Sequence, residues 1–250
     1  MMANIVKCSY EMMTPLDREI GKDIVQFIEK VARTCYKSEE AITEQSGEKM
    51  VANLVRSGHL AMLEHVSLTV KFYTDRGVTH EIVRHRVASY AQESTRYCNY
   101  GKDKFNGEIT LISPWNAMVM KKPDEPDGAI RVGKWYDIWV EAVDMADNYY
   151  QQLISEGCPP EIARGVLPQS TKSEIVVTYN LREWLHFFSL RVLGTTGKPH
   201  PQIYEVSKPV LYKFAECIPC VFGGLVERLK TCDPYADNPA EQGGLANATP

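Results

Sequence analysis

Two hydrophobic periodicities occur in the same chain, and together they restrict its fold class more than any other feature. Between residues 67 and 74, Leu68, Val70 and Phe72 alternate with polar or small residues, a period of two that is typical of a half-buried strand. After Thr14, apolar residues recur three or four positions apart, as on the buried face of a helix. Strands interspersed with helices predict an α+β or α/β domain. The order of the strands does not follow from this pattern.

The same reasoning assigns the remaining elements. We predict helices at residues 14–35, 48–57, 79–87, 135–153 and 181–192, and strands at residues 67–74, 108–112 and 174–179. The first helix is expected to begin at Thr14 as its N-cap. The fourth helix carries a stripe that predicts core packing, made of Trp135, Trp139, Ala142, Ala146, Tyr149 and Leu153. Residues 1–230 are predicted to form one domain, and residues 231–250 a disordered tail.

Composition indicates a cytoplasmic globular protein. The net charge of -4 argues against nonspecific nucleic-acid binding as the main role. Seven cysteines without a framework spacing, no signal-peptide pattern and no membrane-spanning apolar run all favour the reducing cytoplasm. Cys217 and Cys220 are the only close pair. Without a second pair or a histidine cluster they are interpreted as buried or bystander thiols, and no metal site is predicted.

The densest polar segment covers residues 84–97. Three arginines and a histidine supply donors for a phosphate or an anionic ring. Ser94, Thr95 and Arg96 add hydroxyls and consecutive backbone amides, which together can form an anion-binding nest. On composition alone, a solvated and charged helix face is an equally good interpretation.

Arg84-His85-Arg86, followed after seven residues by Ser94, resembles the signature of the flavin-dependent thymidylate synthases. The flanking Ser89 and the run from Ser94 to Tyr97 are similar to the family's extended motif. Three further segments resemble the family in the same order along the chain, namely residues 58–65, residues 164–168, and residues 180–186 with Arg191 beyond. The resemblance covers roughly residues 50 to 205.

The resemblance implies a fold, a reaction and an assembly. The fold would be α+β, with a central, largely antiparallel sheet flanked by helices. The reaction would convert dUMP to dTMP, with methylenetetrahydrofolate as one-carbon donor, FAD as hydride carrier and NADPH as reductant. The protein would be a homotetramer whose active sites are built from several subunits. FAD binding would rest on arginines, because no Gly-x-Gly-x-x-Gly follows a strand.

The resemblance also implies roles for individual residues. Arg191 and Ser94 would be catalytic, with Arg191 stabilising negative charge on the pyrimidine and Ser94 binding or polarising rather than attacking. The dUMP site would comprise Glu81, Gln92, Ser94, Thr95, Arg96, Arg164 and Arg191. The FAD site would comprise His59, Glu64, Arg84, His85, Arg86, Asn180, Arg182 and His186, with His59 and Glu64 also facing folate.

The chain departs from the family pattern at a few positions. Glu81 stands where many members have glutamine, and Gln92 lies near a place where an acid is frequent. The segment from Gly194 to Glu205 is longer than usual, which leaves His200 and Gln202 unassigned. The departure at Glu81 would alter a contact near the nucleotide.

Three other functions compete with the synthase. A zinc hydrolase would use His59, His65, His80 and His85, which have no recognised ligand spacing. An RNA-binding protein would need a basic balance or an aromatic platform. A noncatalytic nucleotide-binding homologue would be expected to have lost the flavin-site arginines, which are present. That homologue is the alternative we retain.

Overall fold

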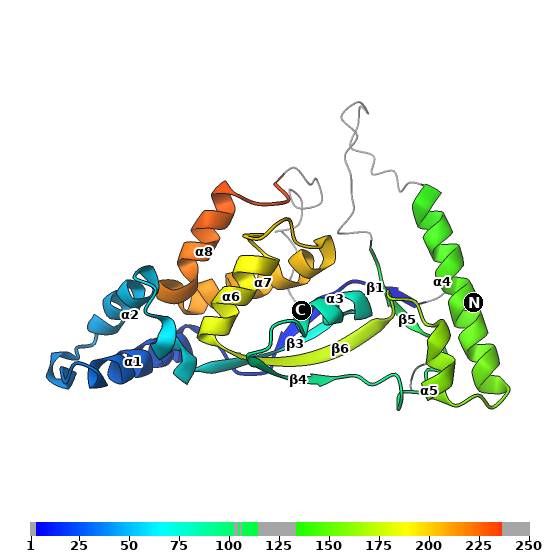
Figure 1. Cartoon of the computed structure of the whole chain (residues 1–250), viewed down its shortest axis with the longest axis horizontal. Coiled ribbons are helices and arrows are strands. Elements are labelled where there is room, and N and C mark those ends of the chain that lie inside the picture. Colours follow the sequence, from blue (N-terminus) through cyan, green and yellow to red (C-terminus); the bar gives the residue numbers. More distant parts are fainter. Residues whose placement is uncertain (1–3, 103–104, 106, 115–133, 237–250) are drawn as a thin grey trace, which may run out of the picture.

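The computed structural model of the chain describes residues 4–102, 105, 107–114 and 134–236. The strands are β1 (Asn4–Val6), β2 (Ser9–Met12), β3 (Ser67–Asp75), β4 (Ala88–Gln92), β5 (Thr110–Ile112) and β6 (Lys172–Asn180). The helices are α1 (Arg18–Thr34), α2 (Ser46–Arg56), α3 (Arg76–Ile82), α4 (Lys134–Ser155), α5 (Pro160–Ala163), α6 (Leu181–Arg191), α7 (Pro201–Cys217) and α8 (Pro219–Thr231), with short 3-10 helices η1 (Glu39–Ala41), η2 (Leu60–His65) and η4 (Arg164–Val166). The predicted α+β class is confirmed (Figure 1).

The long strands β3 and β6 form the centre of an antiparallel sheet with the order β2-β3-β6-β4. Every second residue of both strands is buried, so one face of the sheet belongs to the core. The buried cross-strand pairs are Leu68 with Tyr179, Val70 with Val177, and Phe72 with Ile175. The opposite face carries polar pairs, such as the hydroxyls of Thr69 and Thr178 at 2.9 Å. In Figure 1 the helices α3, α6 and α7 lie on the same side of this sheet.

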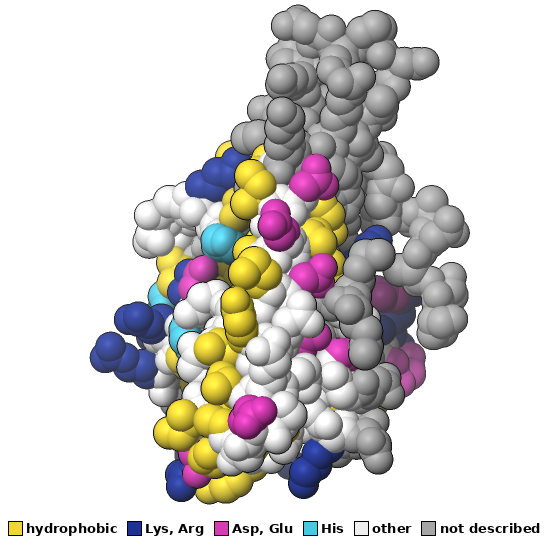
Figure 2. All heavy atoms as spheres, turned by 90° about the vertical axis from the view of Figure 1, so that its right-hand side faces the viewer, with side chains coloured by type: hydrophobic (Ala, Val, Ile, Leu, Met, Phe, Trp, Pro, Cys, Tyr) yellow, Lys and Arg dark blue, Asp and Glu magenta, His cyan; other side chains and the backbone are white. Residues whose placement is uncertain are grey.

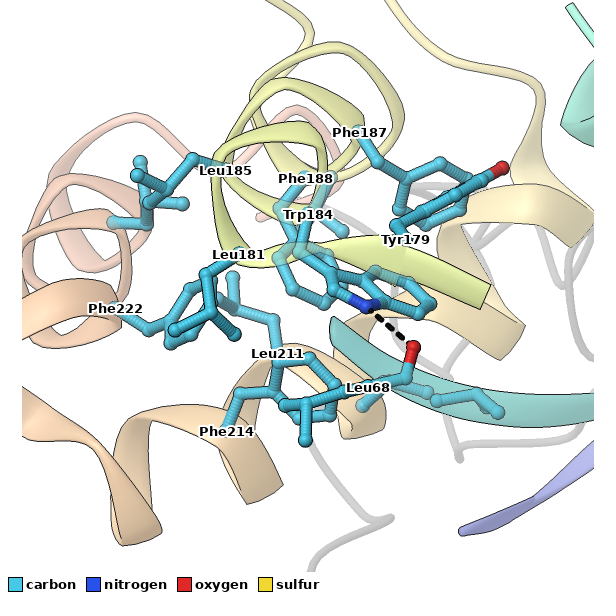
Figure 3. Packing of buried hydrophobic residues seen from close by; sticks show 14 of the residues in the cluster. Leu68, Tyr179, Leu181, Trp184, Leu185, Phe187, Phe188, Leu211, Phe214 and Phe222 are labelled. Atoms are coloured by element: carbon cyan, nitrogen blue, oxygen red, sulfur yellow. Dashed lines mark hydrogen bonds between the residues drawn. The ribbon is translucent and has the colours of Figure 1, made fainter. Parts of the chain in front are cut away.

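Helix α6 is fixed on the buried face by its aromatic residues (Figure 3). It begins directly after β6, where Asn180 Oδ1 accepts a hydrogen bond from the Glu183 N–H at 2.8 Å. Trp184 is fully buried, and its Nε1 donates to the Leu68 carbonyl at 3.1 Å. Its ring lies 4.6 Å from that of Tyr179 and 5.1 Å from that of Phe214. Burial of large apolar side chains contributes about 1.5–3 kcal/mol each, so the direction of α6 is well determined.

A smaller hydrophobic cluster joins α4, α5 and β5 at one end of the molecule, and it consists of Tyr100, Ile109, Leu111, Val143, Tyr150 and Ala163. The Tyr100 N–H donates to the Tyr150 hydroxyl at 3.3 Å. The Tyr100 hydroxyl donates to Glu93 at 2.7 Å. The cluster therefore holds the segment that follows β4 next to α5.

The N-cap of helix α1 lies three residues later than predicted. Asp17 is its N-cap and accepts a hydrogen bond from the Ile20 N–H at 2.9 Å. The Thr14 hydroxyl instead accepts from the Thr69 N–H at 2.9 Å. Thr14 thus continues the pairing of β2 with β3, and the predicted cap is wrong because this tertiary contact occupies its side chain.

The predicted helix over residues 79–87 is wrong at both ends. Asp75 caps α3 through the Val78 N–H at 2.7 Å, and the helix already ends at Ile82. Residues 88–92 form β4, a strand that the sequence analysis did not predict. Tyr90 anchors this strand through its hydroxyl, which donates to the Ile82 carbonyl at 2.9 Å.

The predicted core stripe of α4 is offset from the buried face of the helix. Its members Trp139 and Leu153 are only partly buried against the smaller cluster, and Trp135 and Tyr149 are 40% and 53% exposed. The buried residues of this helix in that cluster are Val143 and Tyr150, which the prediction did not include. One side of this long helix therefore presents apolar residues outward.

The predicted disordered tail is wrong for residues 231–236. Tyr235 is buried, and its hydroxyl donates to the Pro199 carbonyl at 2.5 Å. Its ring lies 4.8 Å from that of Tyr204. Residues 237–250 of that prediction lie outside the described residues. In the described part of the chain, no helix combines the length and apolarity that crossing a bilayer requires.

Candidate active site

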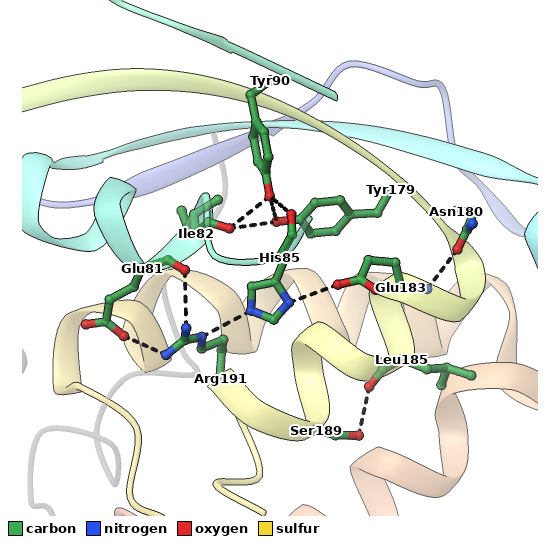
Figure 4. A network of polar contacts seen from close by, with 10 residues as sticks. All are labelled: Glu81, Ile82, His85, Tyr90, Tyr179, Asn180, Glu183, Leu185, Ser189 and Arg191. Atoms are coloured by element: carbon green, nitrogen blue, oxygen red, sulfur yellow. Dashed lines mark hydrogen bonds and ion pairs between the residues drawn. The ribbon is translucent and has the colours of Figure 1, made fainter. Parts of the chain in front are cut away.

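Arg191 is the last residue of α6, and its guanidinium group reaches α3 (Figure 4). One terminal nitrogen lies 2.7 Å from the Glu81 carboxylate, and the other donates to the Glu81 carbonyl at 3.2 Å. The Arg191 and Glu81 side chains are 20% and 32% exposed. The planar, permanently charged guanidinium group of Arg191 is therefore held in one place, where it is partly accessible to solvent.

Glu81 also lines a cavity of about 540 Å³ between α3, α4 and the start of α7. His200 and Gln202 line the same cavity, together with the buried Asp75. Burial raises the pKa of Asp75. His200 and Gln202, which the sequence analysis left unassigned, are thus neighbours of the predicted nucleotide residue Glu81.

His85 is an interior residue, although the resemblance assigns it to FAD. Its Nδ1 lies 3.0 Å from Glu183, and its Nε2 accepts from Arg191 Nε at 3.2 Å. Burial, followed by the charges of Arg191 and His186, lowers the pKa of His85 to about 4. The ring is therefore neutral at pH 7, and both of its nitrogens are already engaged.

Arg84 and Arg86 flank His85 in the sequence and differ from it in exposure. Both side chains are exposed, and neither forms a hydrogen bond or ion pair within the described part of the chain. They remain free to bind an anionic ligand such as a pyrophosphate, as the resemblance implies.

Four of the predicted FAD residues line one cavity of about 620 Å³. These residues are Glu64, Asn180, Arg182 and His186. In the wall of this cavity, Nη1 of Arg182 lies 2.5 Å from Oε1 of Glu64. Leu60, Val87 and Leu185 supply apolar wall, so the space suits a flat ring with polar groups at its edge. The structure thus brings together residues that the sequence separates by more than a hundred positions.

His59 lies apart from that cavity. It lines a neighbouring cavity of about 280 Å³ together with Tyr36 and Met62. Leu60 and Arg182 belong to the walls of both cavities, so the two spaces are adjacent.

Four of the residues predicted to bind dUMP lie near one another at another place in the chain, namely Ser94, Thr95, Arg96 and Arg164. Arg164 donates to the Thr95 hydroxyl at 3.3 Å, although the two residues are far apart in the sequence. The Ser94 hydroxyl accepts from the Arg96 N–H at 3.3 Å. The Arg96 side chain is exposed and its guanidinium lies 5.3 Å from the centre of the Tyr97 ring. Hydroxyls, a backbone amide and two guanidinium groups are the kinds of donor that a phosphate accepts from.

Gln92, the last residue of β4, contacts α3 and β6 and not the residues around Arg164. Its Nε2 donates to Thr79 at 2.9 Å and to Ser173 at 3.2 Å. The side-chain amide nitrogen is therefore occupied by structural contacts.

Arg191 with its partners Glu81 and His85 is separate, within one chain, from Arg164 with its partner Thr95. Among the described residues, no hydrogen bond or ion pair links them. In Figure 1, α5 lies at one end of the molecule and α6 is displaced from it along the long axis. The predicted dUMP residues therefore do not converge on one point of a single chain.

Glu183 lies in the candidate site, although the resemblance gave it no role. It contacts His85 and lines the 620 Å³ cavity. Burial raises its pKa. Its position between Asn180 and His186 in one helix was the available signal, because residues three apart share a helix face.

In the close pair, Cys217 is a buried thiol and Cys220 is partly buried. Cys217 is 4% exposed, and burial raises its pKa. Burial raises the pKa of Cys220 to about 12. All seven cysteines are free. A thiol that stays protonated at neutral pH is a poor nucleophile and metal ligand, which agrees with the bystander interpretation.

Comparisons with known proteins give a consistent result. The family model described as thymidylate synthase complementing protein matches residues 21–220. A flavin-dependent thymidylate synthase of Pyrococcus furiosus is 38% identical over 181 residues, which are 72% of this chain and 67% of that protein. A protein of the same description from Corynebacterium glutamicum is 27% identical and is matched over 95% of this chain and 98% of its own length.

Solved structures show the same fold. A UMP/dUMP methylase PolB from Streptomyces cacaoi, bound with 5-Br dUMP, superposes with a TM-score of 0.71. It is 23% identical, and the match covers 92% of this chain and 98% of that chain. The arrangement of sheet and helices is therefore shared with a nucleotide-methylating protein.

Proposed function

The chain belongs to the thymidylate synthase complementing proteins, the family of flavin-dependent thymidylate synthases, and we propose that it converts dUMP to dTMP with FAD, NADPH and methylenetetrahydrofolate. In the overall reaction, the folate gives a one-carbon unit to the ring and leaves as tetrahydrofolate. NADPH supplies the reducing equivalents and leaves as NADP⁺. The flavin, when bound, carries the hydride between these reactants.

The observation that carries this proposal is the link between Arg191 and the 620 Å³ cavity. Glu183 lines the cavity and contacts His85, and His85 contacts Arg191. A flavin in the cavity would thus lie next to an arginine that faces the pyrimidine. Arg191 would bond the ring edge and stabilise negative charge on it during the transfer of the one-carbon unit.

The residues that line the cavity fit a flavin dinucleotide. Arg182 in its wall would provide a guanidinium group for the pyrophosphate. The exposed Arg84 and Arg86, which precede the lining residue Val87 in the sequence, would add two more. Leu60, Val87 and Leu185 would pack against the flat ring system. Asn180 and His186 would hydrogen-bond its polar edge, and His59 would lie on the folate side.

The residues proposed to bind dUMP fall into two separate sets, one around Arg191 and one around Arg164. This separation supports assembly of the active site from several copies of the chain. Ser94, Thr95, Arg96 and Arg164 would hold the phosphate of a nucleotide whose ring contacts Arg191 of another copy. Glu81 and Gln92 would border this nucleotide. A homotetramer is the assembly we propose.

An exposed apolar face on α4 and α5 offers a surface for that assembly. Figure 2 views this end of the molecule, where hydrophobic side chains form a band. The exposed apolar residues of these elements and the following turn are Trp135, Ile138, Met145, Tyr149, Ile162 and Val166. A contiguous apolar surface on a folded chain is typical of a protein–protein contact.

The test is product formation by the purified protein. Incubation of dUMP with FAD, NADPH and methylenetetrahydrofolate should yield dTMP, identified by its mass, and omission of any one component should stop its formation. Binding of dUMP without dTMP formation under any of these conditions would favour the noncatalytic nucleotide-binding homologue.

A further inference from the structure

We propose that His85 and Glu183 are positioning residues, which hold the guanidinium group of Arg191 by its Nε so that its terminal nitrogens face the pyrimidine. This role differs from the direct contact with FAD that the resemblance implies for His85. It deepens the proposed function and rests on it, because it assumes that Arg191 binds the ring.

The hydrogen bonds determine the tautomer of His85. A guanidinium group can only donate, so His85 Nε2 must be the acceptor of the 3.2 Å contact with Arg191 Nε. The proton of the neutral ring is then on Nδ1. From there it is donated to Glu183 Oε1 at 3.0 Å. Glu183 thus selects the tautomer that is able to hold Arg191, as a carboxylate does for a histidine in many catalytic sites.

The imidazole ring has little freedom to adopt another position. The His85 side chain is 2% exposed. Its ring lies 5.0 Å from that of Phe187 and 6.0 Å from that of Tyr179, and both of these residues belong to the core. A packed ring with both nitrogens engaged keeps its partner in one orientation.

The contacts of Arg191 leave suitable donors for a ligand. Arginine has one N–H on Nε and two on each terminal nitrogen. His85 takes the Nε hydrogen, while Glu81 takes one hydrogen from each terminal nitrogen. Within the described part of the chain, each terminal nitrogen therefore keeps one N–H. These remaining donors can bind carbonyl oxygens of a pyrimidine.

A metal site is the competing interpretation of the same residues. His85, Glu183 and His186 place three ligand atoms within 4.8 Å of one another. A metal on His85 Nδ1 would move the ring proton to Nε2, where it would oppose the Nε–H of Arg191. The observed contact with Arg191 therefore argues for positioning and against a metal.

Two substitutions of His85 separate its two hydrogen bonds. His85→Asn keeps a donor near the position of Nδ1 and loses the acceptor near Nε2, whereas His85→Gln keeps an acceptor near Nε2. Both variants are loaded with FAD, and dUMP binding is measured by calorimetry, with FAD binding followed by absorbance. His80→Ala, an exposed histidine on α3, is the control.

His85→Asn should weaken dUMP binding about tenfold or more, the effect of losing one hydrogen bond to a charged group. His85→Gln should stay within about threefold of the wild type, and FAD binding should be alike in both. Equal dUMP binding by the two variants, or a loss of FAD binding in both, would overturn the proposal. A wild-type protein that does not bind dUMP would instead refute the proposed function.

A second measurement covers the case in which the variants do not fold. In the wild-type protein labelled with ¹⁵N-histidine, the chemical shifts report which ring nitrogen carries the proton. The proposal requires a neutral His85 with its proton on Nδ1. A proton on Nε2 would overturn it, whatever the fate of the variants.

Discussion

The carboxylate of Glu81 lies 2.7 Å from a terminal nitrogen of Arg191, and the Glu81 carbonyl accepts from the other, so that one residue of α3 contacts both terminal nitrogens at the end of α6. The partly buried pair keeps the arginine in place before any nucleotide arrives. The orientation of Arg191 that we propose for the pyrimidine contact is therefore largely preformed in the chain.

Substitution of Glu81 tests whether charge or hydrogen bonding holds this arginine. Glu81→Gln keeps an acceptor oxygen and should bind dUMP within about threefold of the wild type, while Glu81→Leu should bind it about tenfold more weakly. Calorimetric titration with dUMP measures both. If Glu81→Gln is as damaging as Glu81→Leu, the negative charge is the essential feature.

Removal of Arg191 should separate catalysis from cofactor binding. Arg191→Ala should lower the rate of dTMP formation about 100- to 1000-fold, because a preorganised donor to the developing charge is lost. Its affinity for FAD should change little, since Arg191 does not line the 620 Å³ cavity. Rates are measured by product analysis and FAD affinity by absorbance titration. Equal loss of both would mean that Arg191 serves the flavin.

The depressed pKa of His85 predicts a pH dependence of stability. Its pKa is about 4 in the folded chain and about 6.5 when unfolded, so between these values the unfolded state binds the extra proton. This contribution to stability is present above pH 6.5 and is lost as the pH falls towards 4. Glu183, Arg191 and His186 face the ring, and the raised pKa of Glu183 acts in the opposite direction near its own titration.

Comparison of the wild type with His85→Gln separates the contribution of His85 to the pH dependence from that of its titratable neighbours. Urea unfolding at pH 7 and pH 5 should show a larger loss of midpoint in the wild type than in His85→Gln. Identical losses would contradict a buried, neutral His85.

The exposed band on α4 should be required for assembly. Ile138→Glu and Met145→Glu place a charge on residues that are 65% and 49% exposed. A buried unpaired charge is strongly unfavourable, so both variants should have a lower mass than the wild type in light-scattering chromatography and should bind dUMP weakly. Lys230→Glu, in the exposed last turn of α8, is the control. Variants that keep the wild-type mass would place the contact elsewhere.

Trp184 should be a major determinant of stability. Trp184→Ala should lower the free energy of unfolding by about 3–5 kcal/mol through the cavity that it leaves. Trp184→Phe should cost about 1–3 kcal/mol, because the Leu68 carbonyl loses its donor. Tyr97→Phe, at a residue that is 77% exposed, should change it by less than about 0.5 kcal/mol. Urea denaturation measures all three, and a small effect of Trp184→Ala would contradict the packing in Figure 3.

Elements with a strong internal period were predictable from the sequence. β3 and α6 follow their periodicities closely, and the structure confirms both. β4 was missed because it is short and, apart from Tyr90, consists of small or polar residues, so no hydrophobic period is visible in its sequence. Its pairing with β6 is a tertiary feature. The start of α1 was misplaced because Thr14 and Asp17 are both good caps, and only the contact with Thr69 distinguishes them.

The resemblance predicted which residues gather at the flavin cavity better than it predicted how the site residues are arranged in space. The resemblance groups Glu64, Asn180, Arg182 and His186, and the structure brings them to one cavity. It does not indicate that His85 is interior, because burial depends on Phe187 and Tyr179, which are far away in the sequence. The separation of Arg164 from Arg191 likewise follows from tertiary structure.

The absorbance spectrum of the purified protein, recorded without oxygen before and after NADPH addition, tests the central claim most directly. We predict a flavin spectrum that bleaches with NADPH, and bleaches faster when dUMP is present, because flavin and nucleotide share one site. A protein that binds no flavin even after incubation with excess FAD would contradict the account and leave a noncatalytic nucleotide-binding role.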